Sequence, residues 1–439
     1  MLKGPNENGD CMKYIITTLG CKVNQYETQA MESILAEHGH EPAAPGELAD
    51  AVIVNTCAVT AESGRKSRQT IRRLRDENPG AVVAVCGCYS QLRPQEAEQI
   101  GAGVIFGSAG HAQFVAAIER AVSSGEEVRQ VDKPFQRREF EKLPAGAVSG
   151  RTRAMLKIQD GCVNFCTYCI IPYTRGRLRS LPLADAAAEA ERLAAEGYRE
   201  LVLTGIEVAS YGVDLPGKPG LADVIEAVAA VSGPMRIRLG SLEPTVITED
   251  FCRRLAATGK LCRHFHLSLQ SGCDRTLKAM NRKYDCAQFL HAVELLRAAF
   301  PGCGITCDLI TGFPGETEED QQQTLAFIRR CAFSDMHIFP YSRRPGTPAD
   351  QMPNQCTQAV KARRAHEAQM VAREMHRTFL EESTGRVLPV LFESEEGGSV
   401  GHSDTYVLVQ VPEEKLQGQL LPVRITGVRD DRLTGEIVR

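Results

Sequence analysis

Hydrophobic and polar positions in the first 130 residues change repeatedly between two periods. Short apolar runs rich in β-branched residues alternate with longer stretches in which apolar residues recur every three or four positions. The pattern predicts strands at 13–18, 51–56 and 81–85 and helices at 25–38, 61–77 and 110–122. Such alternation is typical of a parallel sheet covered by helices.

Six further strand-and-helix units follow residue 150 at similar spacing. They predict strands at 154–159, 200–204, 236–239, 264–269, 304–310 and 335–340, with helices at 184–196, 221–230, 285–299 and 318–330. Repeated units of this kind form a barrel or part of one, with functional residues on the loops after the strands. A helix at 358–382 leads out of this region. Beyond it, strands at 387–392, 405–411, 420–425 and 432–438 predict a small five-stranded antiparallel barrel.

We therefore expect an α/β protein with three domains. These are an N-terminal parallel-sheet α/β domain at 1–130, a central partial (β/α)6 barrel at 151–375 and a small C-terminal antiparallel β-barrel at 376–439. A linker is expected at 131–150, because that stretch is first charged and then rich in small residues with Pro and Gly. A chain of 439 residues is long enough to bury these cores.

Composition and charge narrow the class of protein. The net charge of -4 provides no strong attraction to nucleic acid or membranes, so any basic surface must be local. The apolar run at 14–18 is too short for a secretory core or a membrane span. The 16 unevenly placed cysteines favour a reducing compartment, with some thiols kept for metal, over a disulfide framework. We expect a soluble, cytoplasmic protein that does not associate with membranes.

Three cysteines share one short loop after the predicted strand at 154–159. They are Cys162, Cys166 and Cys169. A closed zinc site needs four ligands, and no fourth Cys or His lies near enough in sequence to complete one. Soft thiolates also suit iron–sulfur clusters, in which three protein ligands on four irons leave one iron open. The loop therefore favours a cluster with an open iron.

Three more cysteines, Cys21, Cys57 and Cys88, each follow a predicted strand of the N-terminal domain. The carboxyl ends of parallel strands meet at one edge of a sheet, so these thiols are expected to converge. A single cysteine is more often an ordinary buried residue, but three at equivalent strand ends favour a shared site. Cys86 competes for the third place. We prefer Cys88 because Gly87 frees the turn before it, and whether Cys86 can replace it stays open.

Several arginines fall on one face of the predicted helix at 61–77, since their spacing is three, four and three residues. They are Arg65, Arg68, Arg72 and Arg75. A stripe that binds phosphates and a solvated helix surface are both open interpretations. Arg344, beyond the sixth strand of the central domain, is a candidate for a substrate carboxylate or phosphate, with a plain surface role equally open.

The Cys162 loop resembles the cluster motif of the radical S-adenosylmethionine superfamily. The upstream Gly20-Cys21, Asn55-Thr56-Cys57 and Gly87-Cys88 resemble its methylthiotransferase branch. Further similar segments lie at 203–205, 241–244, 266–272, 312–316 and 341–347, and the C-terminal domain is similar to the RNA-associated TRAM barrel. The stretch at 18–28 looks most like the enzymes that act on N6-threonylcarbamoyladenosine in tRNA.

This resemblance implies two [4Fe–4S] clusters and two molecules of S-adenosylmethionine per turnover. Cys162, Cys166 and Cys169 would hold the cluster that binds S-adenosylmethionine, and Cys21, Cys57 and Cys88 an auxiliary cluster that delivers sulfur. The product would carry a methylthio group at C2 of the N6-threonylcarbamoyladenosine next to the anticodon. Implied partners are the tRNA anticodon stem-loop, an electron donor such as flavodoxin or ferredoxin, and a sulfur donor. We expect a monomer, and we assign no acid or base residue.

Six residues are candidates for binding S-adenosylmethionine, five of them at or near the ends of strands of the central domain. They are Tyr168, Thr204, Gly205, Glu243, Ser268 and Gln270. By the same resemblance, Tyr168 would flank the adenine, although a plain core aromatic is an equally open interpretation. The backbone at Thr204 and Gly205 would approach the methionine amino group. For the other three, a satisfied structural hydrogen bond is an equally open interpretation. His264 and His266 are assigned to strand packing, because no partner ligands are evident in the sequence.

Two kinds of alternative function remain. A methylthiotransferase could act instead on isopentenyladenosine in tRNA or on an aspartate of a ribosomal protein. A non-catalytic, metal-stapled RNA-binding protein belongs to a different class. Against that class, the sequence twice offers three ligands where a closed structural site needs four.

Overall fold

The computed structural model describes residues 11–144, 152–233 and 235–438, and the chain divides into two compact units. The first unit takes in the described residues up to 144 together with 159–181 and 342–347, and the second takes in the rest. Residues 145–150 of the expected linker, and residue 151 after them, lie outside the described residues. The described part of that stretch belongs to the first unit, where the Tyr26 hydroxyl donates to the Leu143 carbonyl over 2.7 Å.

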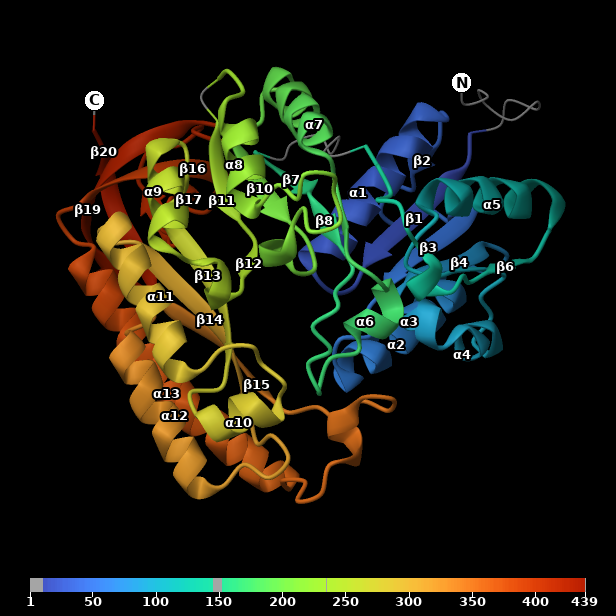
Figure 1. Ribbon diagram of the computed structural model, residues 1–439. Helices are drawn as coiled ribbons and strands as arrows, with labels where there is room; N and C mark the ends of the chain where they lie inside the picture. Colours follow the sequence, from blue (N-terminus) through green and yellow to red (C-terminus); the bar gives the residue numbers. More distant parts are fainter. Residues whose placement is uncertain (1–10, 145–151, 234, 439) are drawn as a thin grey trace. The chain divides into compact units, whose positions relative to one another are not determined.

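The first unit is built on a parallel sheet of six strands in the order β2-β1-β3-β4-β5-β6 (Figure 1). The strands are β1 (Lys13–Thr18), β2 (Glu41–Pro42), β3 (Ala51–Thr56), β4 (Val82–Gly87), β5 (Val104–Phe106) and β6 (Val128–Gln130). The sequence missed β2, β5 and β6, because two or three residues are too few to show a period. A short antiparallel pair, β8 (Gln159–Asp160) with β9 (Arg179–Ser180), also belongs to this unit.

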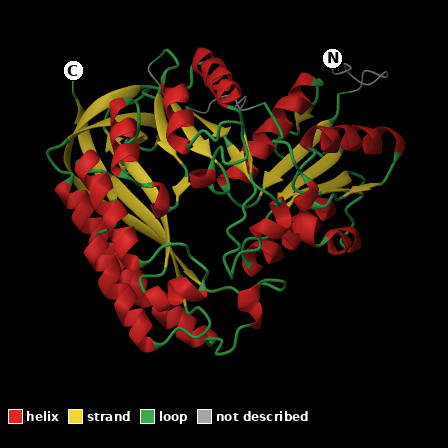
Figure 2. Cartoon of the chain, in the orientation of Figure 1, coloured by secondary structure: helices red, strands yellow, loops and turns green. Residues whose placement is uncertain are grey.

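Helices cover both faces of this sheet (Figure 2). One apolar core joins the sheet to α1 and α5, and the other joins it to α2 and α4. The helices of the unit are α1 (Lys22–Glu37), α2 (Ala61–Glu77), α3 (Cys88–Leu92), α4 (Pro94–Gln99), α5 (His111–Ser124) and α6 (Ile171–Arg175). The Thr60 hydroxyl accepts the Ser63 N–H over 3.0 Å and so caps the start of α2.

The second unit contains two parallel sheets, ordered β11-β10-β7 and β12-β13-β14-β15. Gly240 alone separates β11 from β12, so the chain passes from one sheet directly into the other. The strands are β7 (Arg153–Lys157), β10 (Glu200–Thr204), β11 (Arg236–Leu239), β12 (Ser241–Leu242), β13 (His264–Gln270), β14 (Gly304–Thr311) and β15 (Asp335–Pro340). The helices are α7 (Leu183–Ala195), α8 (Leu221–Ala229), α9 (Glu249–Ala257), α10 (Asp274–Ala279), α11 (Cys286–Ala299), α12 (Glu318–Cys331) and α13 (Gln358–Glu382).

A closed barrel of five strands ends the second unit. Its strands are β16 (Val387–Glu395), β17 (Ser399–Ser403), β18 (Leu408–Val411), β19 (Leu420–Arg429) and β20 (Arg432–Ile437). The expected barrel and α/β class are confirmed, with one correction: the β18–β20 pair is parallel, and the other neighbours are antiparallel. The sequence missed β17 because Ser, Gly and His give it no clear apolar alternation. None of the described helices combines the length and apolar character needed to cross a membrane.

Candidate functional site

Cys21, Cys57 and Cys88 lie at the carboxyl ends of three neighbouring strands. Cys21 follows β1 as the N-cap of α1, Cys57 follows β3, and Cys88 is the first residue of α3 after β4. Gly20 has a φ of +113°, and a Cβ there would come within 2.9 Å of the Cys57 Sγ. Only glycine lets the backbone beside Cys21 approach Cys57 so closely.

The three thiols also affect one another's ionisation. Burial raises the pKa of Cys57 and Cys88, and the surrounding protein raises the pKa of Cys21 although its side chain remains solvent-exposed. The neighbouring sulfurs add to the rise: Cys57 acts on the pKa of Cys21, Cys88 on that of Cys57, and Cys21 on that of Cys88. The three thiols therefore lie near enough to interact electrostatically, and their role as ligands of one cluster stays a prediction.

Cys86 lies elsewhere. It belongs to β4 and packs in the apolar core that includes Met31 and Phe114. Cys88, in contrast, clusters with Ala58 and Tyr89 outside that core. The placement favours Cys88 over Cys86 as the third member of the group.

Asn24 ties the strand ends of this group together. Its Nδ2 donates to the Leu19 carbonyl over 3.0 Å and to the Thr56 carbonyl over 3.1 Å. Its Oδ1 lies 3.5 Å from the Cys21 Sγ and accepts a hydrogen bond from the Arg175 Nη2 over 3.0 Å. The first turn of α1 therefore holds Cys21 through one amide side chain.

Arg175 is a buried cation beside the thiols, and the sequence analysis did not single it out. Its Nη1 lies 2.6 Å from Glu27 Oε1 and 3.2 Å from Asp160 Oδ1, with all three side chains buried. Burial alone would lower the pKa of Arg175, but Glu27 and Asp160 raise it well above its usual value. Burial raises the pKa of Cys21 and Cys88, and the positive charge of Arg175 acts in the opposite direction on both thiols, so the rise is smaller than burial alone would give. The charge favours their thiolate forms, which are the forms that bind metal.

The loop that carries Cys162, Cys166 and Cys169 belongs to the same unit. The Cys162 N–H donates to the Gly176 carbonyl over 3.1 Å, and the Cys169 N–H donates to the Cys166 carbonyl over 2.9 Å. Gly161 has a φ of +74°, and a Cβ there would lie 1.9 Å from a backbone oxygen. The loop is thus closed at its base by backbone contacts that require glycine.

Aromatic side chains pack on this loop. Phe165, at a φ of +47°, stacks on Phe135 with ring centroids 6.2 Å apart and meets the Tyr173 ring edge-on at 6.0 Å. Non-glycine residues adopt such a φ at a cost of about 1 kcal/mol or more, which the surrounding contacts must offset. Tyr168, the candidate for the adenine, is half-buried within the same loop.

Helix α6 connects the two cysteine groups within the first unit. Ile171 packs against the cluster that contains Cys88, and a hydrogen bond from Thr174 lowers the pKa of the Cys88 thiol against the larger effect of burial. Arg175, whose charge acts on Cys21 and Cys88, is the last residue of the same helix. The residues after the Cys162 loop therefore reach the strand-end thiols directly.

The two groups fit iron–sulfur clusters better than single ions. Four ligands around one zinc ion bring sulfurs to about 3.8 Å from one another. Among the described residues, the groups whose ligand atoms all lie within 4.8 Å are both His–carboxylate groups, and neither cysteine group is that compact. Three soft thiolates at wider spacing are the ligand set of a four-iron cluster with one open iron.

Five of the candidate residues lie at strand ends of the second unit. Thr204 ends β10, and Gly205 follows it. Glu243 follows β12 and accepts hydrogen bonds from the Arg282 Nη2 at 2.6 Å to each oxygen. The Ser268 and Ser241 hydroxyls lie 2.8 Å apart, which relates β13 to β12. Gln270 ends β13 at a bulge with a φ of +67°, a strained conformation of the kind that concentrates at functional sites.

Glu207 is a further candidate that the sequence analysis missed. It lies two residues after Gly205, and burial raises its pKa to about 7, with hydrogen bonding from Ser210 opposing the rise. Glu243 raises this pKa further and Arg282 lowers it, so Glu207 faces the same polar group. The signal for Glu207 that the sequence did contain was an acidic residue three positions after the end of β10. Carboxyl groups with strongly raised pKa values cluster at functional sites.

The raised pKa predicts a pH-dependent stability for the second unit. Since the folded pKa of about 7 exceeds the ordinary 4.5, the contribution of Glu207 is fully present below about pH 4.5 and is lost as pH rises through 7. Ionised Glu207 then costs roughly 3 kcal/mol. We expect Glu207→Gln to be more stable relative to wild type at pH 8 than at pH 5, in urea unfolding followed by circular dichroism. Exposed Glu191→Gln is the control, and an equal difference at both pH values would refute the assignment.

The arginine candidates have more partners than the sequence indicated. Arg65 forms a 2.5 Å ion pair with Glu62, and Arg68 lies 3.7 Å from Glu96. These pairs leave fewer arginines of the expected stripe without an acidic neighbour. Arg72 is exposed, and within the described ranges it forms no ion pair.

Arg344 packs on the loop that follows Cys57. Its guanidinium donates to the carbonyls of Ala58 and Val59, with Nε at 3.0 Å from the Val59 oxygen. It also works against the burial effect by lowering the pKa of Cys57. These contacts therefore connect Arg344 to the position of the Cys57 thiol.

Two family models match the chain. One, described as the radical SAM superfamily, matches residues 156–328, and the other, described as the uncharacterized protein family UPF0004, matches residues 13–107. Together the matches include all six cysteines of the two groups.

Relatives of known name match nearly the whole chain. A threonylcarbamoyladenosine tRNA methylthiotransferase of Bacillus subtilis is 37% identical, over 96% of this chain and 95% of that protein. A tRNA-2-methylthio-N6-dimethylallyladenosine synthase of Carboxydothermus hydrogenoformans is 35% identical, over 97% of this chain and 99% of that protein. Among solved structures, the radical S-adenosylmethionine methyltransferase TsrM from Kitasatospora setae aligns with a TM-score of 0.57 at 16% identity. That alignment covers 77% of this chain and 75% of TsrM, and it shows a shared fold.

Proposed function

Because the chain belongs to the radical S-adenosylmethionine methylthiotransferases that modify tRNA, we propose that it acts on N6-threonylcarbamoyladenosine next to the anticodon. The product is the 2-methylthio derivative of that nucleoside. The observation that carries this choice is the 37% identity to a relative named for threonylcarbamoyladenosine, together with the stretch at 18–28. The dimethylallyladenosine synthase at 35% identity supports isopentenyladenosine as the second candidate.

The side chains of that stretch support the strand-end thiols. Asn24 bridges the ends of β1 and β3, Thr28 bonds the Thr18 hydroxyl over 2.7 Å, and Glu27 pairs with Arg175. We therefore attribute the resemblance of residues 18–28 to the threonylcarbamoyladenosine enzymes to the side chains that position Cys21.

As a member of its family, the enzyme uses S-adenosylmethionine and a [4Fe–4S] cluster. We propose that Cys162, Cys166 and Cys169 hold this cluster and that Cys21, Cys57 and Cys88 hold a second one. A bound cluster of this type supplies the electron that cleaves S-adenosylmethionine. The protein's part is to present three thiolates at each site, and the positive charge of Arg175 acts on Cys21 and Cys88 of the strand-end site.

The polar strand ends of the second unit are proposed to bind S-adenosylmethionine. Thr204 and Gly205 offer backbone groups, and Glu243, Ser268 and Gln270 offer side chains, while Tyr168 of the first unit provides an aromatic surface. The reaction consumes two molecules of S-adenosylmethionine, one for the radical step and one for the methyl group. An electron donor such as flavodoxin or ferredoxin and a separate sulfur donor complete the proposal, and the working form is a monomer.

Mass spectrometry of tRNA nucleosides tests the substrate. In cells that lack the gene, we expect 2-methylthio-N6-threonylcarbamoyladenosine to disappear and unmodified N6-threonylcarbamoyladenosine to accumulate. Restoring the gene should restore the product, whereas restoring Cys57→Ala should not. Loss of the 2-methylthio derivative of isopentenyladenosine instead would establish the second candidate.

A further inference from the structure

Two compact groups of histidine and carboxylate side chains exist among the described residues, and the cysteine chemistry uses neither. One is His38, His40 and Glu119 of the first unit, and the other is His266, Asp308 and His337 of the second. In each group the possible ligand atoms lie within 4.8 Å of one another. The hydrogen bonds around the imidazole rings distinguish the two groups.

The first group is complete without a metal. The Met12 N–H points at the His40 Nδ1 over 3.2 Å, so the proton of neutral His40 must sit on Nε2. That nitrogen then donates to the Glu119 Oε1 over 3.0 Å, and the His38 Nδ1 lies 2.6 Å from the same oxygen. A donating Nε2 has no lone pair to offer, so this group is a hydrogen-bonded cluster.

The second group gathers one side chain from each of three adjacent strands. His266 comes from β13, Asp308 from β14 and His337 from β15, and Asp308 and His337 are direct partners in the strand register. On β13 the neighbours Phe265 and Leu267 are completely buried, so the alternation of the strand places His266 on the opposite, more open face.

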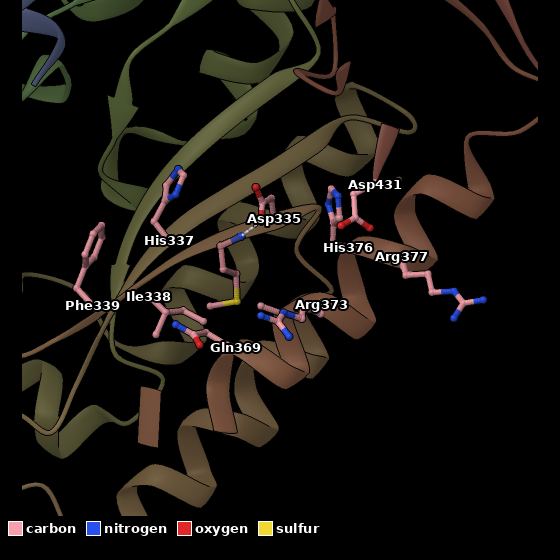
Figure 3. A pocket seen from close by; sticks show the side chains of 11 residues that line it. Asp335, His337, Ile338, Phe339, Gln369, Arg373, His376, Arg377 and Asp431 are labelled. Atoms are coloured by element: carbon pink, nitrogen blue, oxygen red, sulfur yellow. Dashed lines mark hydrogen bonds between the residues drawn. The ribbon is translucent and has the colours of Figure 1, made fainter. Parts of the chain in front are cut away.

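His337 makes this group reachable from solvent. It is exposed on β15, which pairs only with β14 among the described strands. In Figure 3 the His337 ring points away from Gln369 and Arg373 of α13. An ion from solution can therefore reach the group without opening the fold.

The contacts of His266 match those of a metal-bound imidazole. Its Nδ1 lies 2.9 Å from the Thr306 Oγ1, and its Nε2 lies 3.3 Å from the Asp308 Oδ2. The Thr306 hydroxyl also lies 3.0 Å from the His264 Nε2, so it can donate to one ring and accept from the other. When His266 carries its proton on Nδ1 and donates it to Thr306, its Nε2 lone pair faces the Asp308 oxygen, and a cation between the two atoms stabilises that arrangement. Metal-bound histidines are held by such a hydrogen bond at the other ring nitrogen. Two ligands about 2.05 Å from a tetrahedral ion lie about 3.3 Å apart, which matches this N···O separation.

We propose that His266, Asp308 and His337 form a binding site for a divalent first-row transition metal ion. Two imidazoles and one carboxylate leave open coordination positions for water or another oxygen ligand. The site is independent of the proposed tRNA substrate and of both cysteine groups. It revises the assignment of His266 to strand packing, since its two partners come from strands distant in the sequence.

Titration of the cluster-loaded enzyme with Mn²⁺ tests the site, because Mn²⁺ is a hard ion that suits the carboxylate and water oxygens of such a site and has little affinity for cluster thiolates. The electron paramagnetic resonance signal of free Mn²⁺ measures binding. We expect wild type to take up one Mn²⁺ per chain. Asp308→Asn and His337→Ala are each expected to bind at least about tenfold more weakly. Glu119→Gln, in the other histidine group, is the matched control and should bind as wild type does.

Three results would overturn the proposal. They are no uptake by wild type of either Mn²⁺ or the more strongly bound Co²⁺, uptake by Asp308→Asn and His337→Ala equal to that of wild type, or a loss with Glu119→Gln as large as theirs. Iron content and circular dichroism of each variant show whether the fold is kept. Because His337 is exposed, its replacement tests the site even where Asp308→Asn perturbs the sheet.

Discussion

Cys166→Ala is expected to abolish cleavage of S-adenosylmethionine, while Cys57→Ala leaves cleavage intact and abolishes methylthiolation. Each site has three thiols, so loss of one leaves too few ligands to hold a four-iron cluster. We expect a fall of about a thousandfold or more in the affected reaction, equivalent to roughly 4 kcal/mol. Formation of 5′-deoxyadenosine measures cleavage, and the 2-methylthio nucleoside measures the complete reaction.

Cys86→Ala is the matched control for both variants. Cys86 is two residues from Cys88 but packs in the apolar core, so its replacement should keep both reactions near the wild-type rate. Loss of cleavage in both Cys166→Ala and Cys57→Ala would contradict separate roles for the two groups. Retention of the complete reaction in Cys57→Ala would remove the strand-end thiols from the chemistry.

Arg175→Gln is expected to destabilise the first unit by about 3–5 kcal/mol. The change leaves Glu27 and Asp160 buried without their cation, and it removes the hydrogen bond that holds Asn24 beside Cys21. Urea unfolding followed by circular dichroism measures the stability. Iron content after desalting measures how firmly the clusters are held, and we expect the variant to lose iron.

Two further variants separate the role of Arg175 from a general effect of charge. Arg177→Gln removes an exposed arginine two residues away and should change neither stability nor iron content. Arg175→Lys keeps the charge but lacks the fork that reaches Glu27 with two nitrogens, so it should recover only part of the stability. A stable, iron-retaining Arg175→Gln would contradict the structural argument.

The long periodic elements of the fold were predictable from the sequence. The expected ranges for β3, α2 and α13 coincide with the observed ones. For β3 the signal is a short apolar run that is buried throughout, and α2 and α13 each begin at a Thr cap, Thr60 and Thr357. The shortest strands and the parallel β18–β20 pair were not predictable. Strands of two or three residues show no reliable period, and the pairing of distant strands leaves no local trace.

The candidate site also contains residues that could be predicted from the sequence and residues that could not. The six cysteines were visible because each follows a strand or shares one loop, and the strand order then brings Cys21, Cys57 and Cys88 together. Arg175, Glu207 and His266 were missed or assigned to packing, because what distinguishes them is a partner far away in the sequence. For Arg65 the charge was visible in the sequence, whereas its ion pair with Glu62 was seen only in the structure, and its role in binding phosphate stays a prediction.

Iron analysis after anaerobic reconstitution tests most directly whether the enzyme carries two clusters. Two four-iron clusters predict about eight irons per chain in wild type and in Cys86→Ala. Cys57→Ala and Cys166→Ala should each retain about four, since each loses one site. About four irons in wild type, with no further loss in Cys57→Ala, would contradict a cluster at Cys21, Cys57 and Cys88.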